Sequence, residues 1–358
     1  MRRLTKLSAV LAVTALALAG CGGTKTTDNK TSTSDNADIC KTAKGSGPKI
    51  GLAYDVGGRG DHSFNDSAYV GLEKSVKEFK GSCIEGEATD AEAESAREDR
   101  LRQMADGGAT AIIGVGFAYS DSVNKVAPDY PKVNFSVVDG FDPDKIANAN
   151  VAYLGFAENE GSFLVGVAAA EKSKTGTIGF VGGVHNDLIK KFEAGYTAGA
   201  KAAKPGIKVL VTYIQESDLK GFGDPAGGKA AATGEFDKGA DIVYHAAGGS
   251  GSGVFDAAVD AGDGKWAIGV DSDQYLSATT TQQPHILTSM LKRVDTATYD
   301  FIKSVNAGSP LTSYQVYDLK VDGVGYSKSG GFVDDISSNI DGYKAKIISG
   351  EIKVPVAP

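Results

Sequence analysis

Five residues that could contact a ligand follow predicted strands of this chain. They are Asp55, Phe117, Asp139, Gly248 and Asp271. In open α/β sheets, ligands bind beyond the carboxyl ends of the strands, so residues in these positions are candidates for one site. A carboxylate offers only hydrogen-bond acceptors, which suits a ligand that carries hydroxyl or N–H groups. The pattern indicates binding, since no two carboxylates have a spacing that singles out a general acid and a base.

Two glycine-rich segments are similar to phosphate-binding loops but depart from them at decisive positions. The segment Gly223–Ala230 (GDPAGGKA) has Ala230 where a P-loop needs Ser or Thr for magnesium, and Pro225 removes a backbone N–H. The segment Gly248–Gly253 (GGSGSG) lies between a predicted strand and a predicted helix, but it does not match G-x-G-x-x-G. It is either a set of N–H groups for an oxygen-rich ligand or a tight strand–helix turn.

Other signatures of catalysis and metal binding are missing from the sequence. The histidines stand at positions 62, 185, 245 and 285, and none has metal-ligand spacing to another. Neither Cys40 nor Cys83 belongs to a zinc-type pair, and there is no G-x-S-x-G nucleophile motif. We therefore expect a protein that is not an enzyme and that holds no metal and no cofactor.

Short apolar runs alternate with segments of helical periodicity along most of the chain. Strands are expected at 49–54, 111–115, 133–138, 151–155, 177–181, 209–214, 242–245, 266–270 and 286–290. Helices are expected at 66–80, 91–104, 120–130, 160–172, 187–203, 227–238, 253–261 and 293–307. The alternation predicts parallel sheets with helices on both faces, in two Rossmann-like blocks near 49–155 and 156–272.

The composition is that of a folded, acidic protein. Of 358 residues, 41% are hydrophobic and 23% are charged, which excludes a disordered or fibrous chain. The 47 glycines are roughly twice the usual share, as a fold with many strand–helix turns requires. The formal net charge of -8 disfavours a nucleic-acid partner, because such proteins usually carry a basic surface.

The N-terminus has the features of an export signal. A basic start precedes an apolar run from Leu7 to Ala19, which is shorter than the ~20 residues that span a bilayer. The sequence LAGC that ends at Cys21 resembles the bacterial lipobox, in which the cysteine is lipidated. We expect residues 1–20 to be a signal peptide and Cys21 to anchor the protein on the extracytoplasmic face of the cell membrane. The alternative is a plain signal peptide with an incidental cysteine.

Residues 21–48 are predicted to form the lipidated cysteine and a flexible tether. The segment is rich in Ser, Thr, Asn and Asp, and it buries too little apolar surface to offset its chain entropy. The other cysteines are Cys40 and Cys83, and an oxidising compartment permits a disulfide between them. The alternative is two buried free thiols.

Several segments resemble one known family in order along the chain. They include Lys49–Asn65 (KIGLAYDVGGRGDHSFN), Val151–Gly161 (VAYLGFAENEG), Gly221–Pro225 (GFGDP), Gly269–Gln274 (GVDSDQ) and Ile347–Pro355 (IISGEIKVP). On these segments the chain resembles the basic membrane protein family, lipid-anchored substrate-binding proteins of ABC importers whose characterised members bind purine nucleosides. The resemblance implies an α/β type I periplasmic-binding-protein fold, with two Rossmann-like lobes and three crossovers near 155, 275 and 320.

The resemblance also implies domain limits and partners. Lobe 1 would comprise residues 49–155 and 276–320, and lobe 2 residues 156–275 and 321–358. The strand 286–290 and the helix 293–307 would then belong to lobe 1. The implied partners are a purine nucleoside (inosine, guanosine or adenosine) and an ABC permease in the membrane. We expect a monomer and no nucleic-acid partner.

In this family the ligand lies in a cleft between the lobes, and five residues here match positions around the base. Phe64 would stack on one face of the purine and Phe222 on the other. The alternative for each ring is core packing, which fits Phe222 less well because its loop is rich in Gly and Asp. Asp139 would accept a hydrogen bond from a ring N–H, which favours hypoxanthine or guanine. Asp55 and Asn65 would shape the floor of the cleft.

Three further residues match positions around the sugar. The resemblance implies that Asp271 accepts hydrogen bonds from the ribose hydroxyls and that Gly248 offers backbone contacts. Lys292 would donate to ribose oxygens or neutralise Asp271. From the residues alone, Lys292 and Asp139 are better explained as solvated surface charges, whereas the resemblance favours binding roles.

Other function classes fit parts of the pattern. A sugar or autoinducer receptor of the same fold would also use Asp and aromatic residues. A surface nucleoside hydrolase would use the same cleft, although the sequence shows no nucleophile or metal set. An adhesin-like structural role would require no small ligand at all.

Overall fold

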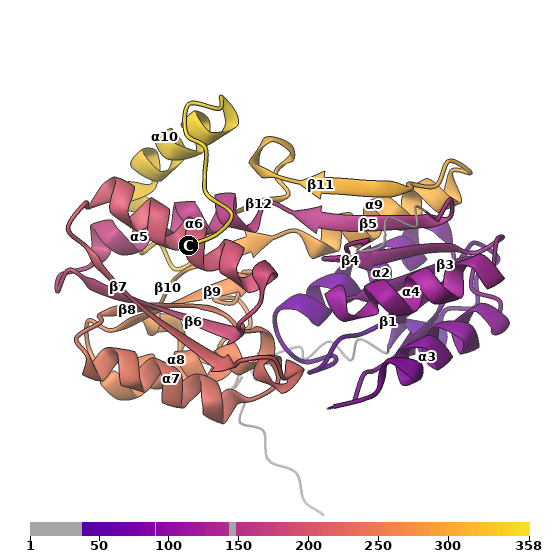
Figure 1. Cartoon of the computed structure of the whole chain (residues 1–358), viewed down its shortest axis with the longest axis horizontal. Helices are drawn as coiled ribbons and strands as arrows, with labels where there is room; N and C mark the ends of the chain where they lie inside the picture. Colours follow the sequence, from indigo (N-terminus) through magenta and orange to yellow (C-terminus); the bar gives the residue numbers. More distant parts are fainter. Residues whose placement is uncertain (1–37, 90, 143–147) are drawn as a thin grey trace, which may run out of the picture. The chain divides into compact units, whose positions relative to one another are not determined.

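The computed structural model describes residues 38–89, 91–142 and 148–358. Within these residues the strands form two six-stranded sheets. The first sheet has the order β11-β5-β4-β3-β1-β2 and is parallel throughout. Its strands are β1 (Lys49–Ala53), β2 (Ser82–Gly86), β3 (Ala111–Val115), β4 (Asn134–Val138), β5 (Val151–Phe156) and β11 (Ser313–Tyr317). In Figure 1, β11 lies beside β5 although it comes late in the chain.

The second sheet has the order β12-β10-β9-β8-β6-β7. Its strands are β6 (Thr177–Val184), β7 (Lys208–Gln215), β8 (Ile242–Ala246), β9 (Trp266–Asp271), β10 (Ile286–Lys292) and β12 (Val324–Tyr326). All pairs are parallel except β10 with β12, which run antiparallel. We call the first sheet with its helices the first lobe, and the second sheet with its helices the second lobe.

Helices cover both faces of each sheet, as the strand–helix alternation predicts. The helices are α2 (Phe64–Phe79), α3 (Glu94–Asp106), α4 (Ser120–Val126), α5 (Glu158–Lys172), α6 (Asp187–Ala203), α7 (Pro225–Asp237), α8 (Gly251–Ala261), α9 (Val294–Asn306) and α10 (Ser337–Ile348). Buried side chains of α3 and α4 pack on one face of the first sheet, and those of α2 and α9 on the other. In the second lobe, α7 and α8 cover one face and α5 and α6 the other.

The placement of β10 corrects one expectation from the sequence. The strand at 286–290 was expected in lobe 1, but β10 pairs with β9 in the second sheet, with Met290 beside Val270. The chain reaches β10 from β9 through residues 272–285, and consecutive strands usually neighbour one another. The crossover therefore follows Lys292 instead of lying near 275. The next helix, α9, packs on α2 in the first lobe, where Asp295 N–H donates to Ser67 Oγ at 3.1 Å.

Besides the four-residue helix at 39–42 and the 3₁₀ turns, four elements have no counterpart among the expected ones, namely β2, β11, β12 and α10. β2 (SCIEG) and β11 (SYQVY) are the two edge strands of the first sheet and carry polar or exposed residues. β12 has three residues, and α10 has only Ile340 and Ile347 buried. An element at the edge of a fold buries little surface, so its sequence shows weak hydrophobic periodicity.

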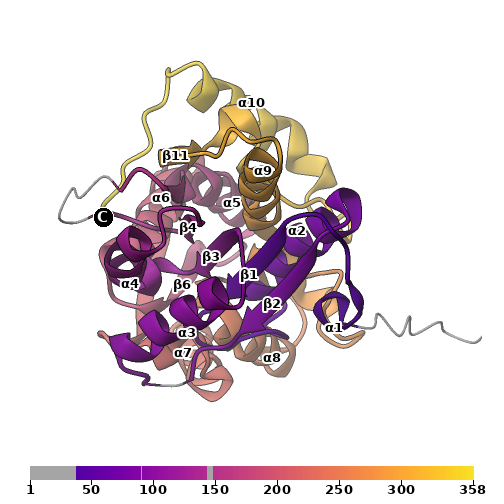
Figure 2. The ribbon, with the colours of Figure 1, turned by 90° about the vertical axis from the view of Figure 1, so that its right-hand side faces the viewer.

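The predicted tether ends earlier than residue 48. Residues 39–42 form the short helix α1 (Ile39–Thr42), which lies beside β2 in Figure 2. A disulfide joins Cys40 to Cys83 on β2, and Gly47 N–H donates to Lys80 O at 2.8 Å. These links attach residues 38–48 to the first lobe, so a flexible tether is wrong for them. Cys21, the signal peptide and the first part of the tether lie outside the described residues.

No helix within the described ranges combines the length and the apolar character that crossing a membrane requires.

The disulfide predicts that stability depends on oxidation. Cys40 and Cys83 are 43 positions apart, so the bond restricts a long loop of the unfolded chain. The double variant Cys40→Ser with Cys83→Ser is expected to lose about 2–4 kcal/mol in the free energy of unfolding. Denaturant unfolding with and without reductant measures this, and only the wild type is expected to respond to reductant. An unchanged wild-type midpoint on reduction contradicts the prediction.

Candidate binding site

One pocket collects side chains from both sheets. Its empty volume is about 540 Å³, including space open to solvent, which is within the range of small-molecule sites. The structure brings all eight residues expected around the ligand to its lining: Asp55, Phe64, Asn65, Asp139, Phe222, Gly248, Asp271 and Lys292. Most of them follow strands or begin helices, as the rule for open α/β sheets requires. That they hold a ligand remains a prediction.

The start of α2 is organised by a half-buried carboxylate. Asp61 accepts the backbone N–H groups of Ser63, Asn65 and Asp66 at 2.8–3.1 Å. The Asn65 side chain donates to Asp61 Oδ2 at 3.1 Å and accepts from Asp55 N–H at 3.0 Å. Both ends of the Asn65 amide are therefore engaged within the protein. This network fixes the backbone on either side of Phe64, which begins α2.

Among the residues that the structure describes, Lys292 is the one lysine in the pocket lining, and its ammonium is surrounded by acidic and aromatic groups. Its side chain is 2% exposed, and Nζ lies 2.6 Å from Asp139 Oδ2. The ring centroids of Phe64 and Phe156 are each 5.0 Å from Nζ, within cation–π distance. Burial acts to lower the pKa of Lys292, but Asp139, Glu158 and Asp271 together raise it above its usual value. The lysine is thus held charged inside the protein.

Asp271 lies at the end of β9 and meets the first lobe directly. Ser63 Oγ donates to Asp271 Oδ2 at 2.7 Å, and Ser272 Oγ donates to Ser63 O at 3.0 Å. These bonds join the start of α2 to the end of β9. They leave the other oxygen of Asp271 without a hydrogen bond among the described residues.

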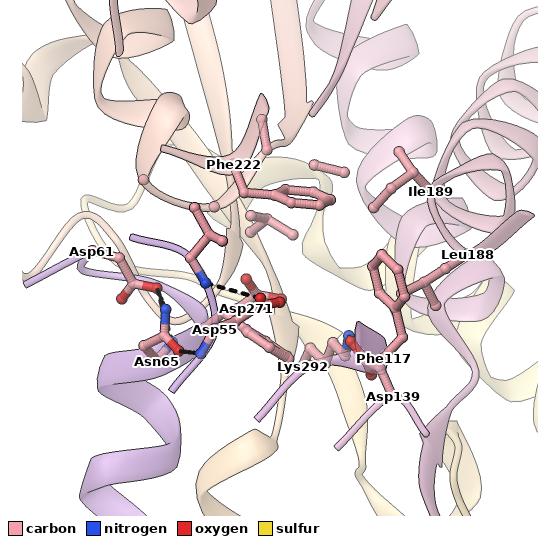
Figure 3. A pocket seen from close by; sticks show the side chains of 18 of the residues that line it. Asp55, Asp61, Asn65, Phe117, Asp139, Leu188, Ile189, Phe222, Asp271 and Lys292 are labelled. Atoms are coloured by element: carbon pink, nitrogen blue, oxygen red, sulfur yellow. Dashed lines mark hydrogen bonds and ion pairs between the residues drawn. The ribbon is translucent and has the colours of Figure 1, made fainter. Parts of the chain in front are cut away.

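The loop that carries Phe222 is tightly packed. The hydroxyl of Ser250 donates to Gly221 O and accepts from Asp224 N–H, both at 2.7 Å. A Cβ on Gly221 would lie 2.1 Å from Gly183 O, so only glycine fits this close approach. Figure 3 shows the Phe222 ring across the pocket from Lys292 and Asp139. The motif GFGDP therefore serves to bring an aromatic ring to the cavity wall.

Two of the pocket carboxylates stand on left-handed backbone. Asp139 has φ +59° and Asp271 has φ +62°. Asp tolerates this conformation better than most residues. The conformation turns the chain sharply at the ends of β4 and β9, where both side chains line the pocket. Asp139 Oδ1 has no hydrogen-bond partner in the part of the chain that the structure describes, and it is buried.

Burial perturbs two of the carboxyl groups strongly. Burial raises the pKa of Asp55 to about 7, although Val56 N–H and Arg97 act to lower it. Burial likewise raises the pKa of Asp271 to about 6, against the opposing influence of Lys292 and Ser63. Gly116 packs against Asp55 so closely that a Cβ there would lie 2.2 Å from Asp55 Oδ2. The pocket lining therefore contains more acidic groups than the positive charge of Lys292 can balance.

Comparison with known proteins identifies the family. The family described as ABC transporter substrate-binding protein PnrA-like (Bmp) matches residues 49–357. The chain belongs to this family. The Bmp family consists of substrate-binding proteins, and the chain's two α/β lobes have the type I periplasmic-binding-protein fold.

Relatives of the Bmp family and one solved structure agree with this assignment. The CD4+ T-cell-stimulating antigen of Listeria monocytogenes is 35% identical over 327 residues, covering 86% of this chain and 88% of that protein. The ABC transporter nucleoside-binding protein BmpA of Lactococcus lactis is 35% identical over 323 residues, covering 86% and 89%. An ABC transporter solute-binding protein from Aeropyrum pernix superposes with TM-score 0.73 and 27% identity, covering 86% and 94%.

Sequence reasoning missed several residues around this Bmp-family pocket. Asp61, Leu188, Ile189 and Phe192 also line it. Three of these are apolar residues at the start of a helix, where a pocket-lining side chain looks the same in sequence as a core one. Glu158 was also not predicted. It is not in the pocket lining but lies 3.6 Å from Lys292 Nζ, and no sequence motif indicates such a contact. The position of Asp61 before a helix start was the one signal available.

The buried carboxyl of Asp55 predicts a pH-dependent stability. Its pKa is about 7 in the folded chain and about 3.9 in the unfolded chain. Its contribution to the free energy of unfolding is therefore full below about pH 4 and is lost as pH rises through about 7. Asp55→Asn is expected to stabilise the ligand-free protein at pH 8 by on the order of 3 kcal/mol more than at pH 5.

Denaturant unfolding at the two pH values measures this difference. Asp263→Asn, at an exposed position away from the pocket, is the matched control and is expected to show no such change. An equal effect of Asp55→Asn at both pH values would show that the carboxyl is not perturbed.

Proposed function

We propose that this protein is a lipid-anchored extracytoplasmic receptor that binds a purine nucleoside and delivers it to an ABC permease. The observation that carries the proposal is the pocket itself, where several phenyl rings, those of Phe64 and Phe222 among them, converge with several carboxylates. A nucleoside presents a flat aromatic base and a ring of hydroxyl donors, which match these two kinds of group. The BmpA relative of Lactococcus lactis, described as nucleoside-binding, supports the same ligand class.

Each part of the ligand has a counterpart in the pocket. Phe64 and Phe222 would stack on the base, and the unpaired Asp139 Oδ1 would accept a ring N–H. Asp271 would accept ribose hydroxyls through the oxygen that Ser63 does not occupy. Gly248, at φ +53°, would bring backbone N–H groups close to the sugar. Closure of the lobes would bury the ligand by a hinge motion.

The charge of the pocket favours an uncharged ligand. Four aspartates line it, at positions 55, 61, 139 and 271, and Lys292 is already paired with Asp139. A phosphate group would add negative charge next to these carboxylates, and like charges repel strongly where water is excluded. A nucleoside therefore fits better than a nucleotide.

Aromatic stacking predicts the effect of Phe222→Ala. Loss of one stacked ring costs ~1–3 kcal/mol, which is roughly a 5- to 150-fold rise in Kd. Isothermal titration calorimetry with inosine, guanosine and adenosine measures the change. Phe332→Ala is the control, because Phe332 packs against Trp266 outside the pocket lining.

The same titrations test the ligand class. Binding of free ribose in preference to every nucleoside would favour a sugar receptor, and hydrolysis of the nucleoside during long incubation would indicate an enzyme. Failure of all ligands to bind would refute the proposal. Unchanged affinity of Phe222→Ala would refute the stacking role alone.

The lipid anchor predicts where the protein is found. Cys21→Ala removes the thiol that would be lipidated in the LAGC motif. The variant is expected to leave the membrane fraction for the soluble extracytoplasmic or culture fraction, measured by cell fractionation and immunoblotting. Cys83→Ser serves as the control for loss of a cysteine elsewhere. Retention of Cys21→Ala in membranes would contradict lipid anchoring.

A further inference from the structure

A buried glutamate lies directly behind the pocket lysine. Glu158, the first residue of α5, has a side chain that is 1% exposed, and its Oε1 lies 3.6 Å from Lys292 Nζ. Its Oε2 accepts from Lys191 Nζ at 3.3 Å. Oε1 itself has no hydrogen-bond partner among the described residues. Glu158 is not among the residues that line the pocket.

The two carboxylates that lie within 4 Å of Lys292 Nζ in the described chain, Asp139 and Glu158, come from different lobes. Asp139 follows β4 of the first sheet, whereas Glu158 begins α5, directly after the chain leaves β5 of the first sheet for the second lobe. Lys292 ends β10, just before the chain crosses back into α9. The ammonium therefore lies where two of the connections between the lobes run, with one carboxylate on each side.

The burial of the Glu158 carboxylate requires a physical explanation. Removing a carboxylate from water costs several kcal/mol unless a partner compensates it. Lys191 compensates Glu158 in part but is itself one-third exposed, with 32% of its side chain accessible. Capping the start of α5 would not need burial, since an exposed acidic residue serves a helix N-terminus equally well. The remaining partner is Lys292.

We propose that Glu158 is a positioning residue for ligand binding, which holds the Lys292 ammonium at the pocket wall from the side of the second lobe. This inference rests on the proposed nucleoside function. Asp139 is the shorter contact, but it lies in the lining and is the group offered to the base. Glu158 keeps Lys292 charged and directed at the pocket when Asp139 engages the ligand.

Several ionisable groups face this pair. Those around Lys292 are Asp139, Asp271 and Glu158, and those around Glu158 also include Lys191 and the phenols of Tyr244 and Tyr314. Burial raises the pKa of Glu158, while Lys292 and Lys191 oppose that change. Without the charge of Glu158, Lys292 has one negatively charged neighbour fewer, and its pKa is therefore lowered.

The first experiment is a double-mutant cycle on nucleoside affinity. Calorimetry compares the wild type, Glu158→Gln, Lys292→Met and the double variant. Glu158→Gln is expected to raise Kd roughly tenfold in the wild-type background and to have little effect in Lys292→Met. Glu160→Gln is the matched control: it removes a half-buried carboxylate of the same helix that accepts Leu319 N–H at 3.0 Å, and it is expected to bind like the wild type. Equal effects of Glu158→Gln in both backgrounds would assign Glu158 a structural role and overturn the proposal.

The second experiment needs no ligand. NMR of lysine-labelled protein, with the Lys292 signal assigned by its loss in Lys292→Met, follows the ammonium as pH rises. Glu158→Gln is expected to shift the Lys292 titration to lower pH, and Glu160→Gln is expected to leave it unchanged. An unchanged titration in Glu158→Gln overturns the inference. If the wild type binds no nucleoside, the proposed function fails, and this titration still decides whether Glu158 holds Lys292.

Discussion

The site depends on one buried ammonium. A charged lysine that is 2% exposed is stable only because carboxylates and aromatic rings surround it, at 2.6 Å for Asp139 and about 5 Å for two phenyl centroids. In return, the lysine makes it possible to bury acidic groups that would otherwise repel one another. The acceptor-rich character of the pocket and the presence of this one cation are therefore parts of the same electrostatic arrangement.

The other requirement is a rigid start to α2. One carboxylate, Asp61, accepts three backbone N–H groups there and also the side chain of Asn65. The same turn carries Phe64 into the pocket and presents Ser63 to the opposite lobe. Side chains that line the pocket and side chains that join the two lobes are thus positioned by one hydrogen-bond network. A short stretch of sequence therefore sets much of the pocket wall.

The sequence predicted most of the fold because its central strands are buried on both faces. Runs such as Ala111–Val115 and Ile242–Ala246 have every residue buried, and such runs are unmistakable. The edge strands were not predicted, because they are partly exposed and carry polar residues. β10 was assigned to the wrong lobe, because the periodicity of one strand does not indicate which strand it pairs with. Four of the eight pocket residues were also indicated by their positions after strands, namely Asp55, Asp139, Gly248 and Asp271, and the other four were found only through motif resemblance. Glu158 was not found, because a buried partner of a buried lysine carries no local sequence pattern.

The left-handed backbone at Asp139 and Asp271 limits how the pocket can change. Most side chains are strained in that conformation, and Asn and Gly join Asp as the residues that adopt it readily. Exchange of Asp for Asn replaces one acceptor oxygen with an NH₂ donor while keeping the turn. A single Asp-to-Asn substitution at either position could therefore change the ligand preference without altering the backbone. Most other residues would require a different backbone conformation at the ends of β4 and β9.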